Sequence, residues 1–171
     1  MQAITTYLPS LAGINVEKEL QQLSKALRPV PPTVWILGGA KLDKIDLFNN
    51  ILKTADYILV GGALAVSFLR AKGLPTGMSR ISPKSIAIAR KLLKNNRATK
   101  KIILPVDFMV AEKMSPDAPA TVTSFDHLKI NHIGLDLGEK TIELFKQYLR
   151  RAKTIVWNGP LGYFELAKYS K

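Results

Sequence analysis

Four short apolar runs constrain what this chain can fold into more than any other feature of its sequence. Each run is apolar on both faces instead of alternating with polar residues, which is typical of parallel strands covered by helices on both sides. We therefore expect an α/β fold: a doubly wound, Rossmann-like domain of three layers, α/β/α, with a mainly parallel sheet. The runs lie at residues 34–37, 57–60, 101–106 and 154–157.

Helical periodicity fills most of the intervals between these runs. Because right-handed crossovers connect parallel strands, the expected spatial order is third, second, first, fourth, with the fourth strand at an exposed edge. Residues 110–132 show no regular pattern apart from one short strand at 121–125. Helices are expected at 43–55, at 63–72, from Ser82-Pro83 to Asn95, and at 139–152.

Residues 1–32 are distinct from the rest of the chain. Apolar residues recur there with helical spacing, and Asn15 is the expected N-cap. Three prolines between residues 29 and 32 then prevent the helix from continuing. We divide the chain into a connecting helix and linker at 1–32 and a domain at 33–171. The apolar stripe of this helix needs another surface to cover it, and it consists of Val16, Leu20, Leu23 and Leu27.

Positive charge is concentrated in one part of the chain. Lys and Arg number 25 against 13 Asp and Glu, a net charge of +12, and no acid lies between Asp56 and Asp107. Ten bases lie in that interval, and we call the stretch that holds them the Arg70–Lys101 patch. Such a patch attracts anionic ligands, so nucleic acid, nucleotides and sugar phosphates are candidates, and a solvated face without a ligand is the alternative.

Several protein classes are excluded by what the sequence lacks. Without cysteine, the chain can form neither a disulfide nor a thiolate metal cluster, and two histidines are too few for a histidine-rich metal site. The longest apolar run, 57–69, is too short and too interrupted for a membrane span. No basic segment followed by an apolar stretch begins the chain, so we expect no secretory signal, no membrane partner and a cytoplasmic location.

Three of the four expected strands run directly into glycine, at 38–39, 61–62 and 159. Ligands of an open parallel sheet bind at the carboxyl ends of its strands, where glycine lets backbone N–H groups approach closely. Each glycine could be a plain turn, but their recurrence at one edge favours a phosphate or nucleotide crevice. Lys41 and Lys44 would bring charge to its mouth, although neither a P-loop nor a dinucleotide-binding fingerprint is present.

Four further polar residues are weighed individually. Glu165 could accept hydrogen bonds from a ribose diol at the same edge. Asp107, at the end of the third expected strand, is interpreted as a helix cap rather than a catalyst. His127 and His132 are interpreted as surface or structural residues.

Five motifs stand in sequence along the chain: Gly38-Gly-Ala-Lys-Leu-Asp-Lys-Ile45, Val60-Gly-Gly-Ala-Leu-Ala65, Leu104-Pro-Val-Asp107, Gly134-Leu-Asp-Leu-Gly138 and Trp157-Asn-Gly-Pro-Leu-Gly-Tyr-Phe-Glu165. In this order and spacing they resemble the phosphoglycerate kinase family, and residues 8–20 resemble its interdomain helix. The resemblance implies the nucleotide-binding half of a two-domain kinase. That enzyme moves a phosphoryl group between the acyl phosphate of 1,3-bisphosphoglycerate and ADP, with Mg²⁺ carried on the ADP or ATP.

The same resemblance implies roles for individual residues. Lys41 and Lys44 resemble the two lysines that contact the nucleotide and the transferring phosphates. Glu165 resembles the ribose-binding glutamate, and Asn158 resembles a residue near the triphosphate. The residues that resemble the walls of the family's adenine slot are Gly61, Gly62, Gly134 and Leu135.

The chain departs from the family's pattern at three positions. One residue fewer separates Lys41 from Lys44, which on a helix would turn Lys44 by about 100°. Ala63 replaces the third glycine of a glycine triplet, and Arg80 stands where an apolar adenine contact is usual.

Two parts of the family's reaction centre are not found in the sequence. The Gly-Gly-Gly-Asp-[Ser/Thr] loop that cradles the phosphates and reaches the metal would follow Glu165, and the phosphoglycerate site belongs to the other domain. We therefore expect a sheet that is incomplete at its C-terminal side, self-association at that truncated edge, and no catalysis by the isolated chain. The alternative function is a non-catalytic basic α/β module that binds nucleic acid through the Arg70–Lys101 patch.

Overall fold

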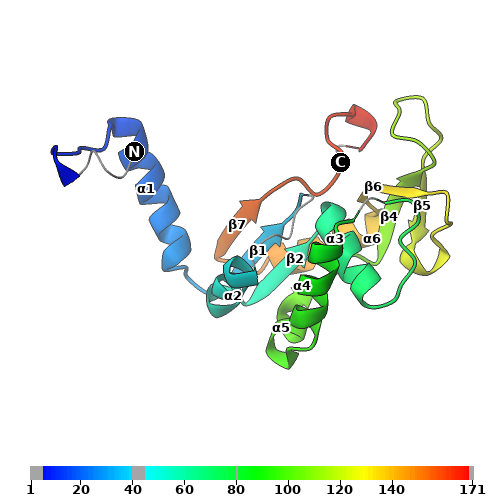
Figure 1. The fold of residues 1–171 in the computed structure, drawn as a ribbon, viewed down its shortest axis with the longest axis horizontal. Coiled ribbons are helices and arrows are strands. Elements are labelled where there is room, and N and C mark those ends of the chain that lie inside the picture. The colour runs from blue at the N-terminus through cyan, green and yellow to red at the C-terminus, as the bar shows by residue number, and fades with distance from the viewer. Residues whose placement is uncertain (1–5, 40–44, 80, 170–171) are drawn as a thin grey trace.

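The computed structural model describes residues 6–39, 45–79 and 81–169. Its main sheet has four parallel strands in the order β3-β2-β1-β7 (Figure 1). This confirms both the expected parallel sheet and its order, and it leaves β7 at an edge of the described sheet. The strands are β1 (Thr33–Leu37), β2 (Tyr57–Val60), β3 (Ile102–Ile103) and β7 (Thr154–Asn158).

The third strand is shorter than predicted, because a helix occupies its expected start. Asn95 accepts hydrogen bonds on its side chain from the backbone N–H groups of Arg97 (3.0 Å) and Ala98 (3.2 Å). These bonds cap α5 (Asn96–Lys101), which the sequence analysis missed. At the other end, Pro105 has no N–H to extend the ladder.

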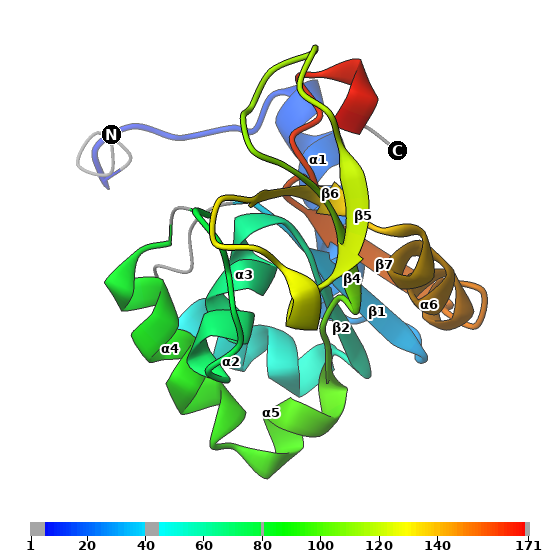
Figure 2. The ribbon, with the colours of Figure 1, turned by 90° about the vertical axis from the view of Figure 1, so that its right-hand side faces the viewer.

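Helices cover both faces of this sheet, as predicted. Figure 2 shows α6 (Glu139–Leu149) on one side of the strands and the remaining sheet-covering helices on the other. Ser82 holds the N-cap position of α4 with proline after it, but its hydroxyl makes no capping bond. Gly73, at φ +81°, follows α3 as the predicted stop. The helices opposite α6 are α2 (Ile45–Thr54), α3 (Gly62–Ala71), α4 (Pro83–Leu93) and α5.

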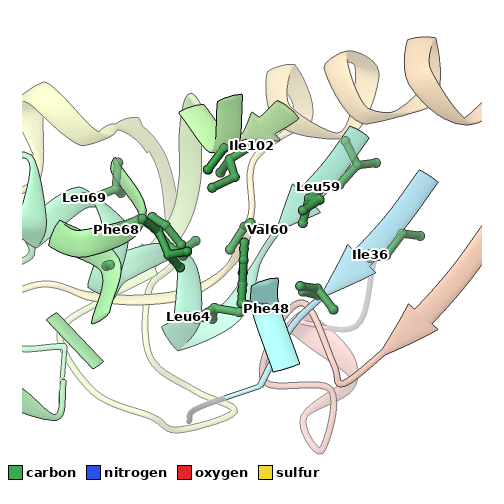
Figure 3. Close-up of a cluster of buried hydrophobic side chains, with 14 of the residues drawn as sticks. Ile36, Phe48, Leu59, Val60, Leu64, Phe68, Leu69 and Ile102 are labelled. Carbon is green, nitrogen blue, oxygen red and sulfur yellow. The ribbon is translucent and has the colours of Figure 1, made fainter. Parts of the chain in front are cut away.

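The core lies between the sheet and the helices α2 to α5 (Figure 3). Leu59 and Phe68 are fully buried within it, and the rings of Phe48 and Phe68 lie 5.9 Å apart in a tilted arrangement. Burying one side chain of this size stabilises the fold by about 1.5–3 kcal/mol. The apolar strand residues therefore hold the main sheet in place.

A second, antiparallel sheet was not predicted. Residues 110–132 are mostly irregular, as expected, but the strands that border them, at 107–111 and 133–137, pair with each other. Its order is β5-β4-β6, and the pairing of β4 with β6 shifts register between Met109 and Val110. The expected short strand at 121–125 is present as β5, followed by a short 3₁₀ helix, Phe125–His127. The strands are β4 (Asp107–Ala111), β5 (Thr121–Ser124) and β6 (Ile133–Leu137).

Asp107 joins the second sheet to α6. Its carboxylate accepts hydrogen bonds from the backbone N–H groups of Lys140 (3.1 Å) and Thr141 (2.8 Å), and from the Thr141 hydroxyl (2.6 Å). These donors lie in the first turn of α6, where N–H groups lack helical partners. The interpretation of Asp107 as a helix cap is confirmed.

The N-terminal helix α1 (Ile14–Leu27) projects away from the body of the molecule (Figure 1). No residue of α1 is buried, and the four residues of the predicted stripe are 51–78% exposed. Gly13, not Asn15, holds the N-cap position, so that detail was wrong. No helix among the described residues is both long and apolar enough to cross a membrane.

Candidate nucleotide site

The loops that follow β1 and β7 are joined at the carboxyl edge of the main sheet. Gly38 donates its N–H to the carbonyl of Asn158 (2.9 Å), and Gly39 donates to the carbonyl of Pro160 (2.7 Å). A Cβ on Gly38 would lie 2.0 Å from the Pro160 oxygen, so only glycine permits this approach. The chain reverses its winding direction between β1 and β7, which is where open parallel sheets bind ligands.

The loop after β2 joins the same junction. Gly61 holds the N-cap position of α3, and Gly62 adopts a positive φ of +59° and donates its N–H to the carbonyl of Leu161 (2.8 Å). A Cβ on Gly61 would lie 2.4 Å from a methyl group of Leu161. All three glycine-terminated strand ends therefore meet at one place, and the positive end of the α3 dipole lies there.

Beside this junction is a cavity of about 250 Å³. One wall is the start of α3, a second wall comes from β4 and β6, and the loop after β7 closes the rest. Its surface is mainly apolar, and its described charged residues are Asp136, which is buried, and Glu165, which is exposed. The lining residues are Gly39, Gly62, Ala63, Val66, Phe108, Met114, Gly134, Leu135, Asp136, Pro160, Leu161, Gly162, Tyr163 and Glu165.

The structure brings four of the predicted site residues together around this cavity: Gly62, Gly134, Leu135 and Glu165. Gly61 does not line the cavity. It holds the N-cap position of α3 and lies against the side chain of Leu161. Asn158 is exposed at the end of β7 and reaches the junction through its carbonyl.

Three positions singled out by the sequence analysis cannot be placed against the cavity. Lys41, Lys44 and Arg80 lie outside the described residues. The two histidines, by contrast, are described and stay away from it. His127 is exposed with its Nδ1 2.9 Å from the Ser124 hydroxyl, and His132 accepts from the N–H of Met78 through its carbonyl (2.8 Å).

Sequence reasoning identified only part of the wall that the second sheet provides, through Gly134 and Leu135. Phe108 and Asp136 come from β4 and β6, whose pairing has no local signature in the sequence. Asp136 lies within a motif already singled out, yet only its neighbours were assigned to the site. The close approach of Gly162, whose Cβ would lie 2.1 Å from Asp136 Oδ1, and the bond from Tyr163 N–H to the Leu135 carbonyl (2.7 Å) hold the closing loop against β6.

The described residues contain no group of three or more His, Asp or Glu side chains arranged to hold a metal ion. Of the cavity's two described carboxylates, Glu165 is exposed, whereas Asp136 is buried and accepts a hydrogen bond from the N–H of Leu137 (2.8 Å). A pocket with apolar walls and a few polar groups at its edge is suited to a flat heterocycle that carries a polar substituent.

Comparisons with known proteins agree with this geometry. The family model described as phosphoglycerate kinase matches residues 1–171. The phosphoglycerate kinase of Enterococcus faecalis is 41% identical over 169 residues, which are 98% of this chain and 42% of that protein. The phosphoglycerate kinase of Finegoldia magna is 42% identical over 171 residues, 98% of this chain and 43% of that protein.

Solved structures give the same result. The structure of phosphoglycerate kinase from Coxiella burnetii superposes with a TM-score of 0.87 at 36% identity, over 94% of this chain and 42% of that one. The enzyme from Pyrococcus horikoshii OT3 gives a TM-score of 0.80 at 28% identity, over 95% of this chain and 42% of that one. The chain thus spans less than half the length of these relatives.

Proposed function

The chain belongs to the phosphoglycerate kinase family, and on that premise we propose that residues 33–171 form a nucleotide-binding part of such a kinase, with ADP or ATP in the cavity beside α3. The observation that carries the proposal is the convergence of three glycine-terminated strand ends on an apolar cavity with Glu165 at its rim. The whole enzyme's reaction, phosphoryl transfer between 1,3-bisphosphoglycerate and ADP, is part of the same proposal.

The adenine ring would lie between the apolar walls of the cavity. Val66 of α3 and Leu135 of β6 offer apolar surface, and the glycines at 62 and 134 leave room for a flat ring to approach the backbone. Glu165 would accept hydrogen bonds from both ribose hydroxyls, which are charge-assisted and therefore strong.

Phosphoryl transfer requires positioning and positive charge on the phosphate oxygens more than covalent chemistry by the protein. The start of α3 supplies a positive dipole end. In this proposal, Lys41 and Lys44 supply the formal charges that contact the transferring phosphates, and Asn158 lies near the triphosphate.

Mg²⁺ would arrive with the nucleotide, bound to its phosphate oxygens. The described residues offer no cluster of three acidic or histidine side chains to hold the ion by themselves. When bound, the ion would neutralise phosphate charge, and the protein's own task would be to orient the nucleotide that carries it.

Titration calorimetry of ADP binding to the 171-residue chain tests the nucleotide proposal. We expect weak binding that Mg²⁺ hardly changes, and we expect Glu165→Ala to weaken it about tenfold, since a hydrogen bond to a charged group contributes about 1.5–3 kcal/mol. Glu19→Ala on α1 removes the same charge far from the cavity and is the matched control. Equal affinities for wild type and Glu165→Ala would contradict the proposal. Micromolar binding that depends on Mg²⁺ would instead contradict the expectation that the phosphate loop and the metal's ligand are missing.

A coupled assay tests catalysis by the 171 residues alone, for which we expect no turnover. Holding two substrates in reacting geometry contributes about 7–11 kcal/mol to lowering a barrier, and we propose that the phosphoglycerate site lies on the other domain of the family's fold, with residues 1–32 as the connector. Adding that domain in trans, together with a segment that carries the Gly-Gly-Gly-Asp-[Ser/Thr] loop, should restore part of the activity. Turnover by the isolated chain that disappears in Lys41→Ala would show that these residues are a complete catalyst.

A further inference from the structure

The outer surface of α4 and α5 carries a group of exposed bases that the nucleotide proposal does not use. On α4, Lys84, Lys91 and Lys94 are spaced by seven and three residues and lie on one stripe, with Arg90 beside it. The opposite stripe of the helix, which includes Ile88 and Leu92, is buried against the core. We call the exposed bases of the two helices the basic face: Lys84, Arg90, Lys91, Lys94, Arg97 and Lys100.

The structure gives Lys101 of the Arg70–Lys101 patch a separate role, while Arg70 and Lys72, at the end of α3, are exposed bases outside the basic face. Lys101 is partly buried, and its ammonium group donates to the carbonyls of Leu52 (3.1 Å) and Ala55, at the end of α2. Lys101 therefore has a structural role, because a cation is favourable at the C-terminal end of a helix. Arg97 and Lys100, three residues apart, are exposed on α5.

Carboxylates do not neutralise the basic face within the described part of the chain. The ion pair found among the described residues joins Lys146 to Glu143, both on α6. The sequence has no acid from residue 57 to residue 106. The nearest preceding acid, Asp56, accepts a hydrogen bond from the N–H of Thr33 (2.7 Å). Six like charges on two consecutive helices repel one another, and a bound polyanion would relieve that repulsion.

The shape of the basic face favours an extended anion over a small one. Lys84 and Lys94 are separated by about 15 Å along α4, at 1.5 Å per residue, and no cavity found in the described residues is lined by the four bases of α4. Their positions suit contacts with successive phosphates of one backbone. None of the six bases lines the nucleotide cavity, so this surface is separate from the site described above.

The composition of the basic face favours nucleic acid over a membrane as its ligand. A helix that binds a lipid surface exposes large apolar residues to insert into it. No large apolar side chain is exposed on α4 or α5, because the apolar stripe of α4 is already buried in the core. The same lack of exposed aromatic rings leaves no platform for base stacking, so the contacts available are with phosphates.

We propose that the basic face of α4 and α5 binds the phosphodiester backbone of nucleic acid without reading its sequence.

The test is fluorescence anisotropy of the 171-residue chain with a labelled mixed-sequence single-stranded RNA and with a DNA duplex, at NaCl concentrations from about 50 to 200 mM. With up to six phosphates neutralised, affinity should fall about a thousandfold over that range for the duplex and about three hundredfold for the single strand. The triple variant Arg90→Gln, Lys91→Gln, Lys94→Gln should lower the slope of log affinity against log salt by about 2 to 3.

The matched control removes three exposed bases elsewhere: Arg150→Gln, Arg151→Gln, Lys153→Gln, after α6. It has the same net charge as the first triple variant and should keep the slope of the wild type. Circular dichroism checks that both variants are folded, and unchanged ADP binding in both separates this proposal from the nucleotide site.

Three results would overturn the proposal. Equal loss of affinity in the two triple variants would show attraction by net charge alone. Absence of salt-dependent binding to either nucleic acid would show a solvated face without a ligand. Tighter binding to phosphatidylserine-containing vesicles, lost in the α4 variant and kept in the control, would assign the surface to membranes.

Discussion

Strands β2 and β7 have similar sequences and opposite environments. β2 pairs with β1 on one side and β3 on the other, and Ile58, Leu59 and Val60 are fully buried. β7 is paired with β1 alone in the described sheet, and Ile155 and Trp157 are 51% and 64% exposed. An apolar run thus predicts a strand, whereas its position in the sheet decides how much of that strand is removed from water.

The two strands end in the same way despite this difference. Gly62 follows β2 with a φ of +59°, and Gly159 follows β7 with a φ of +82°, both in the left-handed region that favours glycine. The exposed strand therefore also contributes to the cavity beside α3. Its contribution is the loop at 159–165, which is held by backbone bonds to Gly39 and Leu135.

The largest expected effect follows directly from the difference in burial. Leu59→Ala should lower the free energy of unfolding by about 2–5 kcal/mol, because it leaves a cavity in a packed core. Ile155→Ala, a similar truncation on β7, should lower it by less than about 1 kcal/mol, since half of that side chain is already in water. Urea unfolding of both variants measures the two values. Similar losses would mean that the edge strand is covered in solution.

An intermediate effect concerns association of the chain at the β7 edge. An unpaired apolar strand is a template for pairing with another chain, so light scattering should show an average mass that rises with concentration. Trp157→Lys places a charge on that edge and should reduce the rise, while stability changes by less than about 0.5 kcal/mol. Leu20→Lys, on the exposed stripe of α1, is the control for general apolar attraction. A strict monomer at high concentration would contradict the expectation.

The smallest effect lies on α6, the helix that leads into β7. The side-chain hydrogen bond and charge of Lys146 lower the pKa of Glu143 below its ordinary value of 4.5. A lowered pKa in the folded state means that the contribution to stability is complete above the unfolded pKa and is lost as pH falls through the folded pKa. Both side chains are exposed, so the contribution is small.

A carboxyl NMR titration measures this effect directly. Lys146→Met should raise the pKa of Glu143 toward 4.5, and Lys153→Met, beyond the end of the helix, should leave it unchanged. A pKa that stays low without Lys146 would assign its cause to another charge, such as Arg150.

Much of the fold could be predicted because its signals are local. A run such as 57–60 is apolar on both faces, which specifies a buried parallel strand, and the strand order follows from right-handed crossovers. Asp107 was interpreted as a cap because it ends an expected strand, although the first turn of α6 that it caps lies 34 residues further along the chain. The glycine pairs predicted the edge where the cavity lies, since turns at strand ends need them.

The features of the fold and the cavity that the sequence analysis did not predict depend on contacts between residues distant in sequence. Pairing of β4 with β6 joins residues near 108 to residues near 137. In neither segment do apolar and polar residues alternate clearly enough to predict a strand. The wall formed by Phe108 and Asp136 was missed for the same reason. Helix α5 was missed because a single side chain, Asn95, starts it only two residues after α4 ends.

The parallel sheet, its order and the glycine-terminated edge could be predicted from strand propensity, crossover handedness and backbone freedom, and the family from the five motifs. The edge position of β7 was predicted as well, whereas the exposure of each side chain and of each base follows only from the folded structure. Lys101 shows the reason: it resembles the other bases of its stretch in sequence, yet its ammonium group is bonded to the end of α2. Whether a side chain is buried, and which groups it bonds to, depends on its neighbours in space, and these come together only when the chain folds.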